Sequence, residues 1–419
     1  MNQQIIAAQS DIIPAPPAAQ RRWTLALGLY SITSNSLFSN AIWLIYLAAH
    51  GYTPFQIGLF ETLFHIAKFV AEAPTGVFAD LVGRRASLIV SSALSSLSAL
   101  FFLFPAFPVL VALGFALSGL GFAFRGGAES AMICRLAELS GAPDRAARFS
   151  RLFSRIVILG LLAAAFSVSA GGFMSDVSVG LPFIAQSLVI ALGIGPLLLL
   201  PEKRLAHAES HRPFAHFGAG MRAVWRDPWL LSLLLLSALS ASVFTTVGFY
   251  NQLYFHSLGF TLAAIGVIYG ASYALDALYT LFAPRLIARL PAPRLLATFL
   301  GAEALGLLAM SLRAPWLGVL GFLLLFHLSD AVLYPALNTY LNQRAPEEQR
   351  ATVLSLDTGL YSGAMIVLFP LFGFGLTSIP YDVAYKWTLA ALVGGSLLIV
   401  VGALWLTRLR ARRLVSVGD

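Results

Sequence analysis

Hydrophobic residues form runs of about 20 positions along the whole chain, and short polar segments separate these runs. A helix needs about 20 apolar residues to cross the hydrocarbon core of a bilayer. The pattern therefore predicts an all-α polytopic membrane protein with twelve transmembrane helices. The expected spans are 23–48, 54–79, 86–104, 108–134, 152–172, 182–200, 229–254, 262–284, 294–312, 315–341, 352–377 and 383–406.

One long polar segment, residues 201–227, separates the first six spans from the last six and carries five basic residues and three histidines. We expect an N-terminal six-helix bundle at 1–200, a cytoplasmic linker at 201–227 and a C-terminal six-helix bundle at 228–419. The second half of the linker, 214–225, is expected to form an amphipathic helix on the membrane surface.

The two halves carry an internal repeat. Residues 51–58 read G-Y-T-P-F-Q-I-G and residues 259–266 read G-F-T-L-A-A-I-G, an offset of 208. Pro143-Asp144 with Arg145-Ala146 has a weaker echo in the segment 346–351. Two six-span halves in parallel repeat are typical of transporters whose halves rock about a midplane site.

The composition excludes several classes of protein. Charged residues are 11% of the chain and hydrophobic residues 58%, whereas a soluble domain has about 25% charged residues. The single cysteine, Cys134, permits no intrachain disulfide and makes a thiolate metal site implausible. There is no phosphate-binding G-x-x-x-x-G-K-[ST] loop and no H-E-x-x-H motif. We therefore expect no enzyme activity, no cofactor and no metal.

The basic residues predict the orientation in the membrane. Of 27, 23 lie in the two tails and in the loops that connect even-numbered to odd-numbered spans. Two, Arg313 and Lys386, lie in loops on the other side, and two, Lys68 and Arg125, lie inside spans. Positive loops face the cytoplasm, so both termini are expected to be cytoplasmic. This asymmetry also explains the net charge of +8 without a nucleic-acid partner.

After the second span the chain reads Gly76-Val-Phe-Ala-Asp80-Leu-Val-Gly83-Arg84-Arg85. This resembles the G-x-x-x-D-R-x-G-R-R signature of the major facilitator superfamily, and Leu81 replaces a basic residue that is usual there. The stretch 72–75, Glu-Ala-Pro-Thr, resembles the bacterial drug-efflux-like branch. The resemblance implies a conformational latch on the cytoplasmic side, formed here by Glu72, Gly76, Asp80, Gly83, Arg84 and Arg85. Gly76 and Gly83 are expected to allow close helix approach.

Other marks of that family are weaker. Its fourth span carries an Arg followed by Gln-Gly, but here Arg125 is followed by Gly-Gly. Its antiporters have a G-P-x-x-G-G motif in the fifth span, and here only the final pair, Gly171-Gly172, is present.

Ionisable side chains inside the spans form the candidate substrate and proton pathway, because each costs about 3 kcal/mol at the bilayer centre. The second, fourth and tenth spans each place such residues three or four positions apart, on one helical face. The offset of 208 aligns Asp276 of the eighth span with Lys68. The candidate residues are Glu61, His65, Lys68, Arg125, Glu129, Asp276, His327, Asp330, Tyr334 and Asn338.

Structural alternatives remain for several of these residues. Lys68–Glu72 and Arg125–Glu129 can be plain ion pairs one helical turn apart, and the two histidines can be core residues. Glu303, in a span that is usually peripheral, is expected to be structural. Four amides are expected to join helices rather than bind ligand: Asn35, Asn40, Asn251 and Gln252.

The balance of charge favours proton coupling. Six acids and two permanent bases lie in the spans by our count, which leaves four carboxyl groups without a fixed partner. Burial favours the neutral form of a carboxyl group, so some of them should bind a proton during the cycle. The leading proton sites are Asp330, Asp276 and Glu61, with His65 as a possible relay. If Lys68 pairs with Asp276, however, Asp276 stays ionised.

We therefore expect a monomeric, proton-coupled secondary transporter of the inner membrane that exports a small hydrophobic or cationic molecule by antiport. Its partners would be that molecule, protons and the lipid bilayer. The alternatives are a proton-coupled symporter that binds an anionic metabolite through Lys68 and Arg125, and a lipid translocase or a non-transporting receptor on the same fold.

Overall fold

The computed structural model describes residues 15–202 and 213–415, and within them every regular element is a helix. The contacts divide the chain into two compact units. The N-terminal unit comprises Met1–Asn40 and Ile66–Ala208, and the C-terminal unit comprises Ala41–His65 and Glu209–Asp419. The end of the first predicted span and the start of the second therefore pack with the last six. Each unit is described by itself below.

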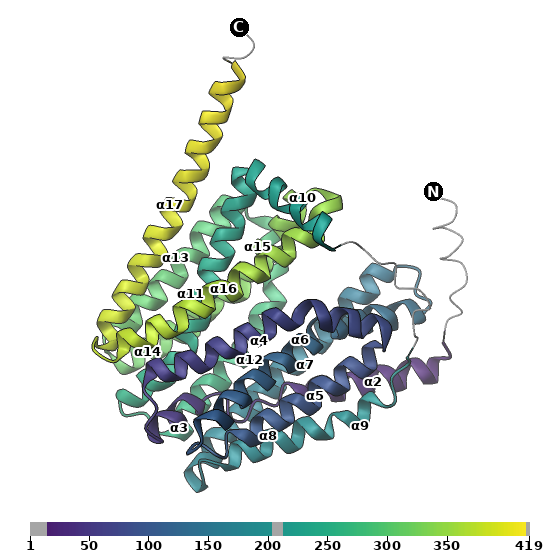
Figure 1. Ribbon diagram of the computed structural model, residues 1–419, viewed down its shortest axis with the longest axis vertical. Helices are drawn as coiled ribbons and strands as arrows, with labels where there is room; N and C mark the ends of the chain where they lie inside the picture. Colours follow the sequence, from purple (N-terminus) through teal and green to yellow (C-terminus); the bar gives the residue numbers. More distant parts are fainter. Residues whose placement is uncertain (1–14, 203–212, 416–419) are drawn as a thin grey trace. The chain divides into compact units, whose positions relative to one another are not determined.

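The N-terminal unit contains the part of α4 (Pro54–Leu81) that follows His65, together with six further helices (Figure 1). These are α2 (Pro17–Ser34), α5 (Arg84–Phe101), α6 (Pro108–Leu139), α7 (Arg145–Val177), α8 (Leu181–Leu192) and α9 (Ile194–Leu197). A cluster of buried side chains that includes Tyr30, Leu88, Met132 and Ile156 joins α2, α5, α6 and α7.

Serine hydroxyl groups hold α5 against α6. Ser87, Ser91 and Ser98 donate to the carbonyl oxygens of Phe124, Gly121 and Gly114, each at 2.7 Å. Small residues allow two helix backbones to approach closely in a membrane, and hydroxyl-to-carbonyl bonds then add specificity. The polar residues of α5 therefore serve helix packing.

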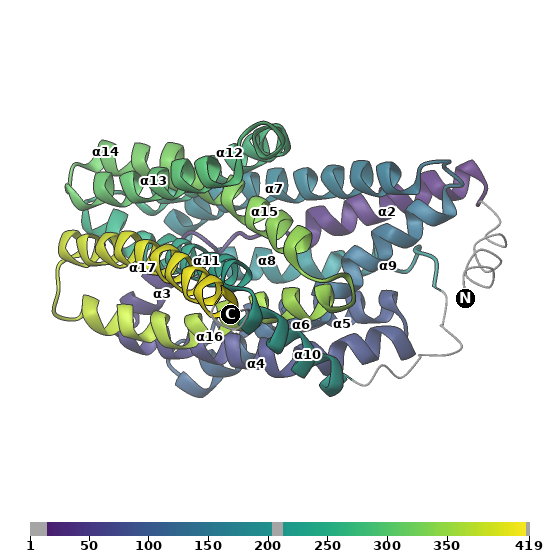
Figure 2. The same cartoon turned by 90° about the horizontal axis from the view of Figure 1, so that it is seen from above.

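The C-terminal unit contains the start of α4 and the remaining helices. These are α3 (Trp43–Ala49), α10 (Pro213–Arg226), α11 (Pro228–Ser257), α12 (Leu262–Arg289), α13 (Ala292–Ser311), α14 (Pro315–Leu320), the π-helical turn η1 (Gly321–Phe326), α15 (His327–Arg344), the short 3₁₀ turn η2 (Glu347–Gln349), α16 (Arg350–Leu376) and α17 (Tyr381–Val415). Figures 1 and 2 show α11, α13, α16 and α17 side by side, with α11 in contact with both α16 and α17.

The repeated G-x-T segments form the same local structure. Gly51 and Gly259 both have φ of +89°, a conformation that favours glycine. Two residues on, the hydroxyl groups of Thr53 and Thr261 each accept a backbone N–H of the next helix, at 3.2 Å. They therefore cap α4 and α12, which begin and end 208 positions apart.

One buried hydrogen bond joins two residues at corresponding positions of the internal repeat. Gln252 Oε1 accepts the N–H of Leu44 at 3.1 Å, and the two residues are 208 positions apart. Gln252 is buried, and this bond joins α3 to α11. The prediction that Gln252 connects helices is confirmed.

Each of the twelve predicted spans corresponds to one, two or three helical elements, but the number of continuous apolar helices is smaller. Among the described residues, eight helices are long and apolar enough to cross a membrane. α4 carries several charges, and α5 is only 18 residues long and rich in serine. The first span is divided between α2 and α3, and the sixth between α8 and α9.

The end of the linker is helical, as predicted, because α10 occupies Pro213–Arg226. Asp227 follows it and caps α11 by accepting the N–H groups of Trp229 and Leu230. The same carboxylate binds Arg344 at 2.7 and 3.0 Å, which ties the start of α11 to the end of α15. The linker residues 203–212 lie outside the described part of the chain.

Candidate functional site

A histidine–carboxylate pair lies inside the C-terminal unit. His327 Nδ1 is 3.0 Å from Oδ1 and 3.1 Å from Oδ2 of Asp276, so α15 and α12 meet at this point. The imidazole packs edge-on against the rings of Phe322 and Phe244, with centroids 4.6 and 5.1 Å away. These aromatic contacts fix the ring so that one nitrogen faces the carboxylate.

The backbone that presents His327 is irregular. η1 occupies Gly321–Phe326 and ends directly before the histidine. A π-helical turn widens the helix by one residue and is frequent at functional sites. Although the hydrophobic pattern predicts one continuous tenth span, it therefore contains α14, η1 and α15.

Asp330 lies one turn beyond His327 and interacts electrostatically with both members of the pair. It is partly exposed, and within the described ranges it makes no hydrogen bond or ion pair. Tyr334, one turn further on, is 57% exposed and interacts electrostatically with Asp330 and Asp357. Asn338 only accepts from Asn342 on its own helix, at 2.9 Å.

The start of α4 brings a second acid–histidine pair into the same unit. Glu61 and His65 are buried, with Glu61 Oε1 3.8 Å from His65 Nε2. The His65 ring contacts the ring of Tyr361 in α16, with centroids 5.7 Å apart. Tyr361 donates to Thr245 at 3.1 Å and interacts electrostatically with Glu61 and Asp330. Tyr361 thus lies between two proposed proton sites.

Two acids and one tyrosine of this region were not among the predicted pathway residues. Tyr361 carries no charge and was not singled out. Glu303 was expected to be structural, but it is 1% exposed and interacts electrostatically with Asp330. Asp357 lies inside the expected span 352–377, so the spans hold seven acids rather than six. A complete count of charged residues in the spans would have found it.

The Glu303 carboxyl group has one hydrogen bond. Ser240 donates to Oε2 at 2.7 Å. The other oxygen, Oε1, is buried and has no hydrogen-bond partner among the described residues. The C-terminal unit therefore contains a buried carboxyl group that has no cation partner among the described residues and interacts electrostatically with Asp330.

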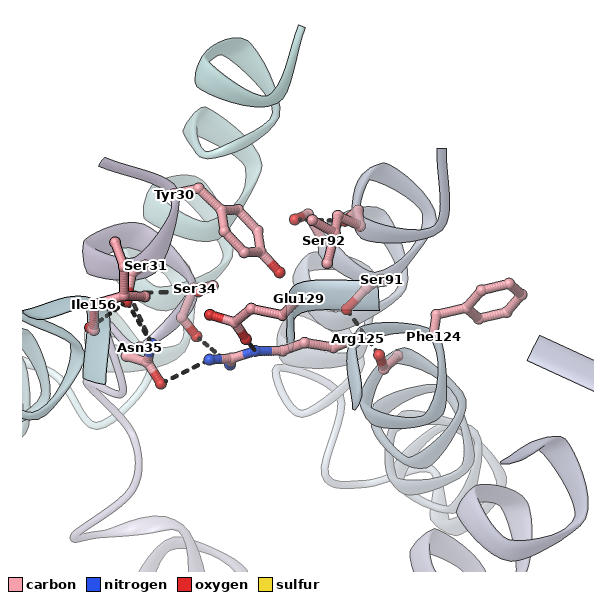
Figure 3. A network of polar contacts seen from close by, with 12 residues as sticks. Tyr30, Ser31, Ser34, Asn35, Ser91, Ser92, Phe124, Arg125, Glu129 and Ile156 are labelled. Atoms are coloured by element: carbon pink, nitrogen blue, oxygen red, sulfur yellow. Dashed lines mark hydrogen bonds and ion pairs between the residues drawn. The ribbon is translucent and has the colours of Figure 1, made fainter. Parts of the chain in front are cut away.

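In the N-terminal unit a polar network surrounds Arg125 on α6 (Figure 3). Its Nε donates to Glu129 Oε2 at 2.7 Å, and its Nη1 and Nη2 donate to Ser34 O at 3.4 Å and Asn35 Oδ1 at 3.1 Å. Asn35 donates to the carbonyl of Ser31 at 2.8 Å. The buried ring of Tyr30 points its hydroxyl group towards Glu129. The guanidinium is thus neutralised and tied to the end of α2.

The network lies where the first predicted span is interrupted. Residues 35–42 between α2 and α3 are not helical, although the hydrophobic pattern predicts one continuous span there. Side chains replace the lost backbone bonds: Ser167 accepts the N–H of Leu37 at 2.8 Å and Gln186 accepts that of Ser39 at 3.0 Å. Non-helical backbone at membrane depth occurs where protein satisfies it or a cavity adjoins it.

Gly171 makes room for this interruption. A Cβ atom at Gly171 would lie 1.8 Å from the carbonyl oxygen of Phe38. Gly171, the first residue of the Gly171-Gly172 pair that resembles the end of an antiporter motif, therefore has a packing reason in this chain.

Lys68 contacts an aromatic ring in the N-terminal unit. Its Nζ is 5.3 Å from the ring centroid of Phe122, and it interacts electrostatically with Glu72. Glu72 itself is exposed. The ionisable residues on one face of the second predicted span are divided between the two units. Glu61 and His65 belong to the C-terminal unit, and Lys68 and Glu72 belong to the N-terminal unit.

The two arginines of the signature are bound within the N-terminal unit. Arg84 donates to the carbonyl of Ala131 at 2.9 Å, and Arg85 binds Glu202 at 2.7 Å. Asp80 is exposed and makes no hydrogen bond or ion pair with the described residues. The role of these residues as a latch stays a prediction.

The two glycines of the signature differ. Gly83 has φ of +128°, so the backbone requires glycine, and a Cβ there would also displace the end of the Glu202 side chain, whose Oε1 would lie 1.9 Å away. At Gly76 a Cβ would meet open space within the described structure. The expectation that Gly76 permits close helix approach stays a prediction.

Comparisons with known proteins agree with the fold. The sequence matches the family described as Major Facilitator Superfamily over residues 24–370 and 252–418. It is 24% identical over 369 residues to YxaM of Bacillus subtilis (strain 168), an uncharacterised transporter of the major facilitator type, and the match covers 84% of this chain and 88% of that protein.

Solved transporters share the fold at low sequence identity. A variant of the nucleoside transporter NupG has a TM-score of 0.77 at 13% identity, and the match covers 91% of this chain and 99% of that one. The D-xylose–proton symporter has a TM-score of 0.71 at 16% identity, covering 91% and 96%. A bacterial homologue of the lysosomal transporter Spinster has a TM-score of 0.65 at 16% identity, covering 93% and 96%.

The comparisons leave the drug-efflux-like branch as a prediction. The matched family covers nearly all of the chain, and the helices of the chain form the expected all-α architecture. The chain belongs to the Major Facilitator Superfamily and is a multi-pass membrane transporter of that family.

Proposed function

We propose that this protein is a proton-coupled secondary transporter that exports a small cationic or hydrophobic molecule by alternating access. The observation that carries the proposal is the contact of His327 with Asp276, with Asp330 one turn away. The ion pairs that Arg and Lys make within the described C-terminal unit use Asp227 or Asp382 instead. Within the described C-terminal unit, the cluster of Asp276, Asp330 and His327 therefore contains a titratable histidine and has no ion pair to an arginine or lysine.

The chemistry of the cluster supports exchange. A neutral imidazole can donate one N–H to a carboxylate, and a second proton converts the group into an imidazolium–carboxylate pair. A cationic substrate and a proton would compete for the same carboxyl oxygens. Because a bound proton excludes the substrate and a bound substrate excludes the proton, the two are expected to cross the membrane in opposite directions, as in antiport. An inward proton gradient then drives export of the substrate.

The alternative, symport of an anionic metabolite, receives less support. It requires Lys68 and Arg125 to bind the anion, but Arg125 is already bound to Glu129, Ser34 and Asn35. An anion would have to displace a carboxylate at 2.7 Å. The intramembrane acids also outnumber the bases.

We also propose that both termini are cytoplasmic and that the protein resides in the inner membrane. Arg313 and Lys386, the two basic residues on the side predicted to be external, lie 3.7 and 3.6 Å from the two carboxylate oxygens of Asp382. One acid thus pairs with both exceptions to the positive-inside pattern, and the proposed orientation is supported by the count of basic residues in the short loops and tails.

Flux measurements in proteoliposomes test the proposal. The purified protein is reconstituted, organic cations are screened for transport, and an imposed pH gradient is compared with an equal pH on both sides. We expect the gradient to drive accumulation of at least one cation against its own gradient. Asp382→Asn is the matched control and should retain this coupling. Cation transport that ignores the pH gradient would overturn the assignment of proton coupling.

A further inference from the structure

A cavity of about 550 Å³ lies in the C-terminal unit near the turn between α12 and α13. The end of α12, the start of α13 and the second half of α15 form its walls. Most of the lining is apolar, as at Ile287 and Leu290, and Thr339 and Tyr340 add polar groups. Its volume falls in the range of about 300–1,000 Å³ that small-molecule sites occupy.

The repeat explains why this space is empty. α4 and α12, and likewise the starts of α5 and α13, are 208 positions apart, so Ala292 corresponds to Arg84. α6 and α15 end at Leu139 and Arg344, an offset of 205, so Thr339 corresponds to Cys134. In the N-terminal unit the Arg84 side chain bonds the carbonyl of Ala131 and interacts with Cys134. Ala292 and Thr339 both line the cavity, so the alanine leaves the place of an arginine side chain unfilled.

Three arginines flank the lining residues in the sequence. Arg285, Arg289 and Arg294 are exposed and adjoin or lie close to lining residues in sequence. Within the described structure none of them makes an ion pair, and no acid occurs between Asp276 and Glu303. This turn joins the ends of two predicted spans, 262–284 and 294–312, where lipid headgroups are expected.

One polar group of the lining has no partner. The Tyr340 hydroxyl is out of contact with solvent and makes no hydrogen bond with the described residues. Because a water-sized atom cannot reach this oxygen, the Tyr340 hydroxyl group does not face the cavity, and the tyrosine contributes its ring to the lining.

We propose that this cavity binds an anionic phospholipid. Part of an acyl chain occupies the apolar space beside Ala292, and the phosphate lies among Arg285, Arg289 and Arg294. Basic pockets between membrane helices bind anionic headgroups in this way. The proposal concerns a site away from the His327–Asp276 pair and does not depend on the proposed substrate.

The charge requirement is tested by titrating the full-length protein in detergent with phosphatidylglycerol and with phosphatidylcholine of equal chain length, and bound lipid is counted by native mass spectrometry. Each arginine should contribute about fivefold to the preference for phosphatidylglycerol over phosphatidylcholine. We therefore expect this preference to fall by about 100-fold in the triple variant Arg285→Gln, Arg289→Gln and Arg294→Gln. The matched control changes three other exposed arginines, Arg145→Gln, Arg151→Gln and Arg155→Gln, and should retain the preference. Equal affinities for the two lipids, or an unchanged preference in the first triple variant, would overturn the proposal.

The chain requirement is tested by filling the cavity. Ala292→Arg restores the arrangement at Arg84 and should weaken binding of the long-chain lipid at least tenfold while the surrounding arginines remain. Ala292→Leu fills the same space without adding charge and should act in the same direction if Ala292→Arg fails to fold. Unchanged long-chain affinity in the variant that folds would contradict the placement of the chain. Competition by inorganic phosphate as effective as that by the lipid would reduce the site to an anion site and overturn the lipid proposal.

Discussion

The intramembrane carboxyl groups differ in the group that neutralises each one. Glu129 is bound by the permanent cation Arg125, which makes it a plain ion pair, whereas Asp276 is bound by a histidine that can gain or lose a proton. Glu303 has only the Ser240 hydroxyl group. Acids with a titratable or neutral partner are better candidates for proton binding than an acid paired with arginine, because their charge can change during the cycle.

The first prediction concerns the proton sites. Asp330→Asn, Asp276→Asn and Glu61→Gln each remove a titratable group with little change in shape. Asp330→Asn and Glu61→Gln should still exchange substrate down its own gradient, but their pH-driven accumulation should fall by at least tenfold. Asp276→Asn also removes carboxyl oxygens that the cation is proposed to share with the proton, so it should lose exchange as well as accumulation. Counterflow and pH-driven uptake in proteoliposomes measure the two activities separately. If all three variants accumulate substrate as well as the unmodified protein, protons bind elsewhere.

Glu303 gives a second residue-scale prediction. A buried carboxylate without a cation is costly, so we expect the neutral acid in this structure. Glu303→Gln keeps an oxygen for Ser240 and should change the free energy of unfolding by less than about 1 kcal/mol. Glu303→Ala should cost about 2–4 kcal/mol, since it leaves a cavity and an unpaired hydroxyl group. Reversible unfolding in mixed micelles distinguishes the two, and a large loss for Glu303→Gln would indicate a charged Glu303.

The sequence predicts which residues share a helix face but not which faces meet. Steps of three and four residues placed His327 and Asp330 on one stripe, and the repeat offset aligned Asp276 with Lys68. Within the C-terminal unit, however, Asp276 is bound by His327. That contact depends on how α12 packs against α15, and no periodicity within one helix contains this information. Tyr361 was missed for a related reason, since an uncharged side chain costs little in a span and attracts no notice.

At the scale of elements, hydrophobic pattern predicts where helices lie and fails where polar side chains take over backbone hydrogen bonds. The G-x-T segments correctly marked the starts of α4 and α12, because the threonine caps are local. The break at residues 35–42 depends on Ser167 and Gln186, which are more than 100 positions away. A hydropathy window cannot detect such partners.

Gly171 supplies the prediction for this element. Gly171→Ala would place a methyl group against the Phe38 carbonyl and should destabilise the protein by about 1–3 kcal/mol by overpacking. It should also impair transport if the interruption of the first span is needed. Gly126→Ala is the matched control, because its Cβ meets open space among the described residues. Thermal unfolding of both variants in the same detergent gives the comparison, and equal stability would contradict a tight approach at Gly171.

For the whole molecule, the distribution of basic residues predicts the orientation. Cys134 is the only cysteine, so Cys134→Ser gives a cysteine-free background. In that background Ser378→Cys should react with a membrane-impermeant maleimide added to intact cells, and Ser150→Cys should react only after the membrane is opened. Both positions are exposed in the structure. Labelling with the opposite sidedness would reverse the topology, and with it the direction of the proposed export.

The balance between inward-open and outward-open states is the last property of the whole molecule that the signature predicts. Arg84 and Arg85 are already bound to Ala131 and Glu202, whereas Asp80 is exposed and unbonded among the described residues, so Asp80 is free to form a contact in another state. Asp80→Asn should therefore change the transport rate and the populations of the two states. It should leave the affinity of the binding-competent state intact, because only the fraction of molecules in that state changes. Cysteine accessibility on the two sides measures the populations, and substrate binding is measured with one state trapped. Loss of binding in the trapped state would mean that Asp80 acts on the substrate site rather than on the equilibrium between states.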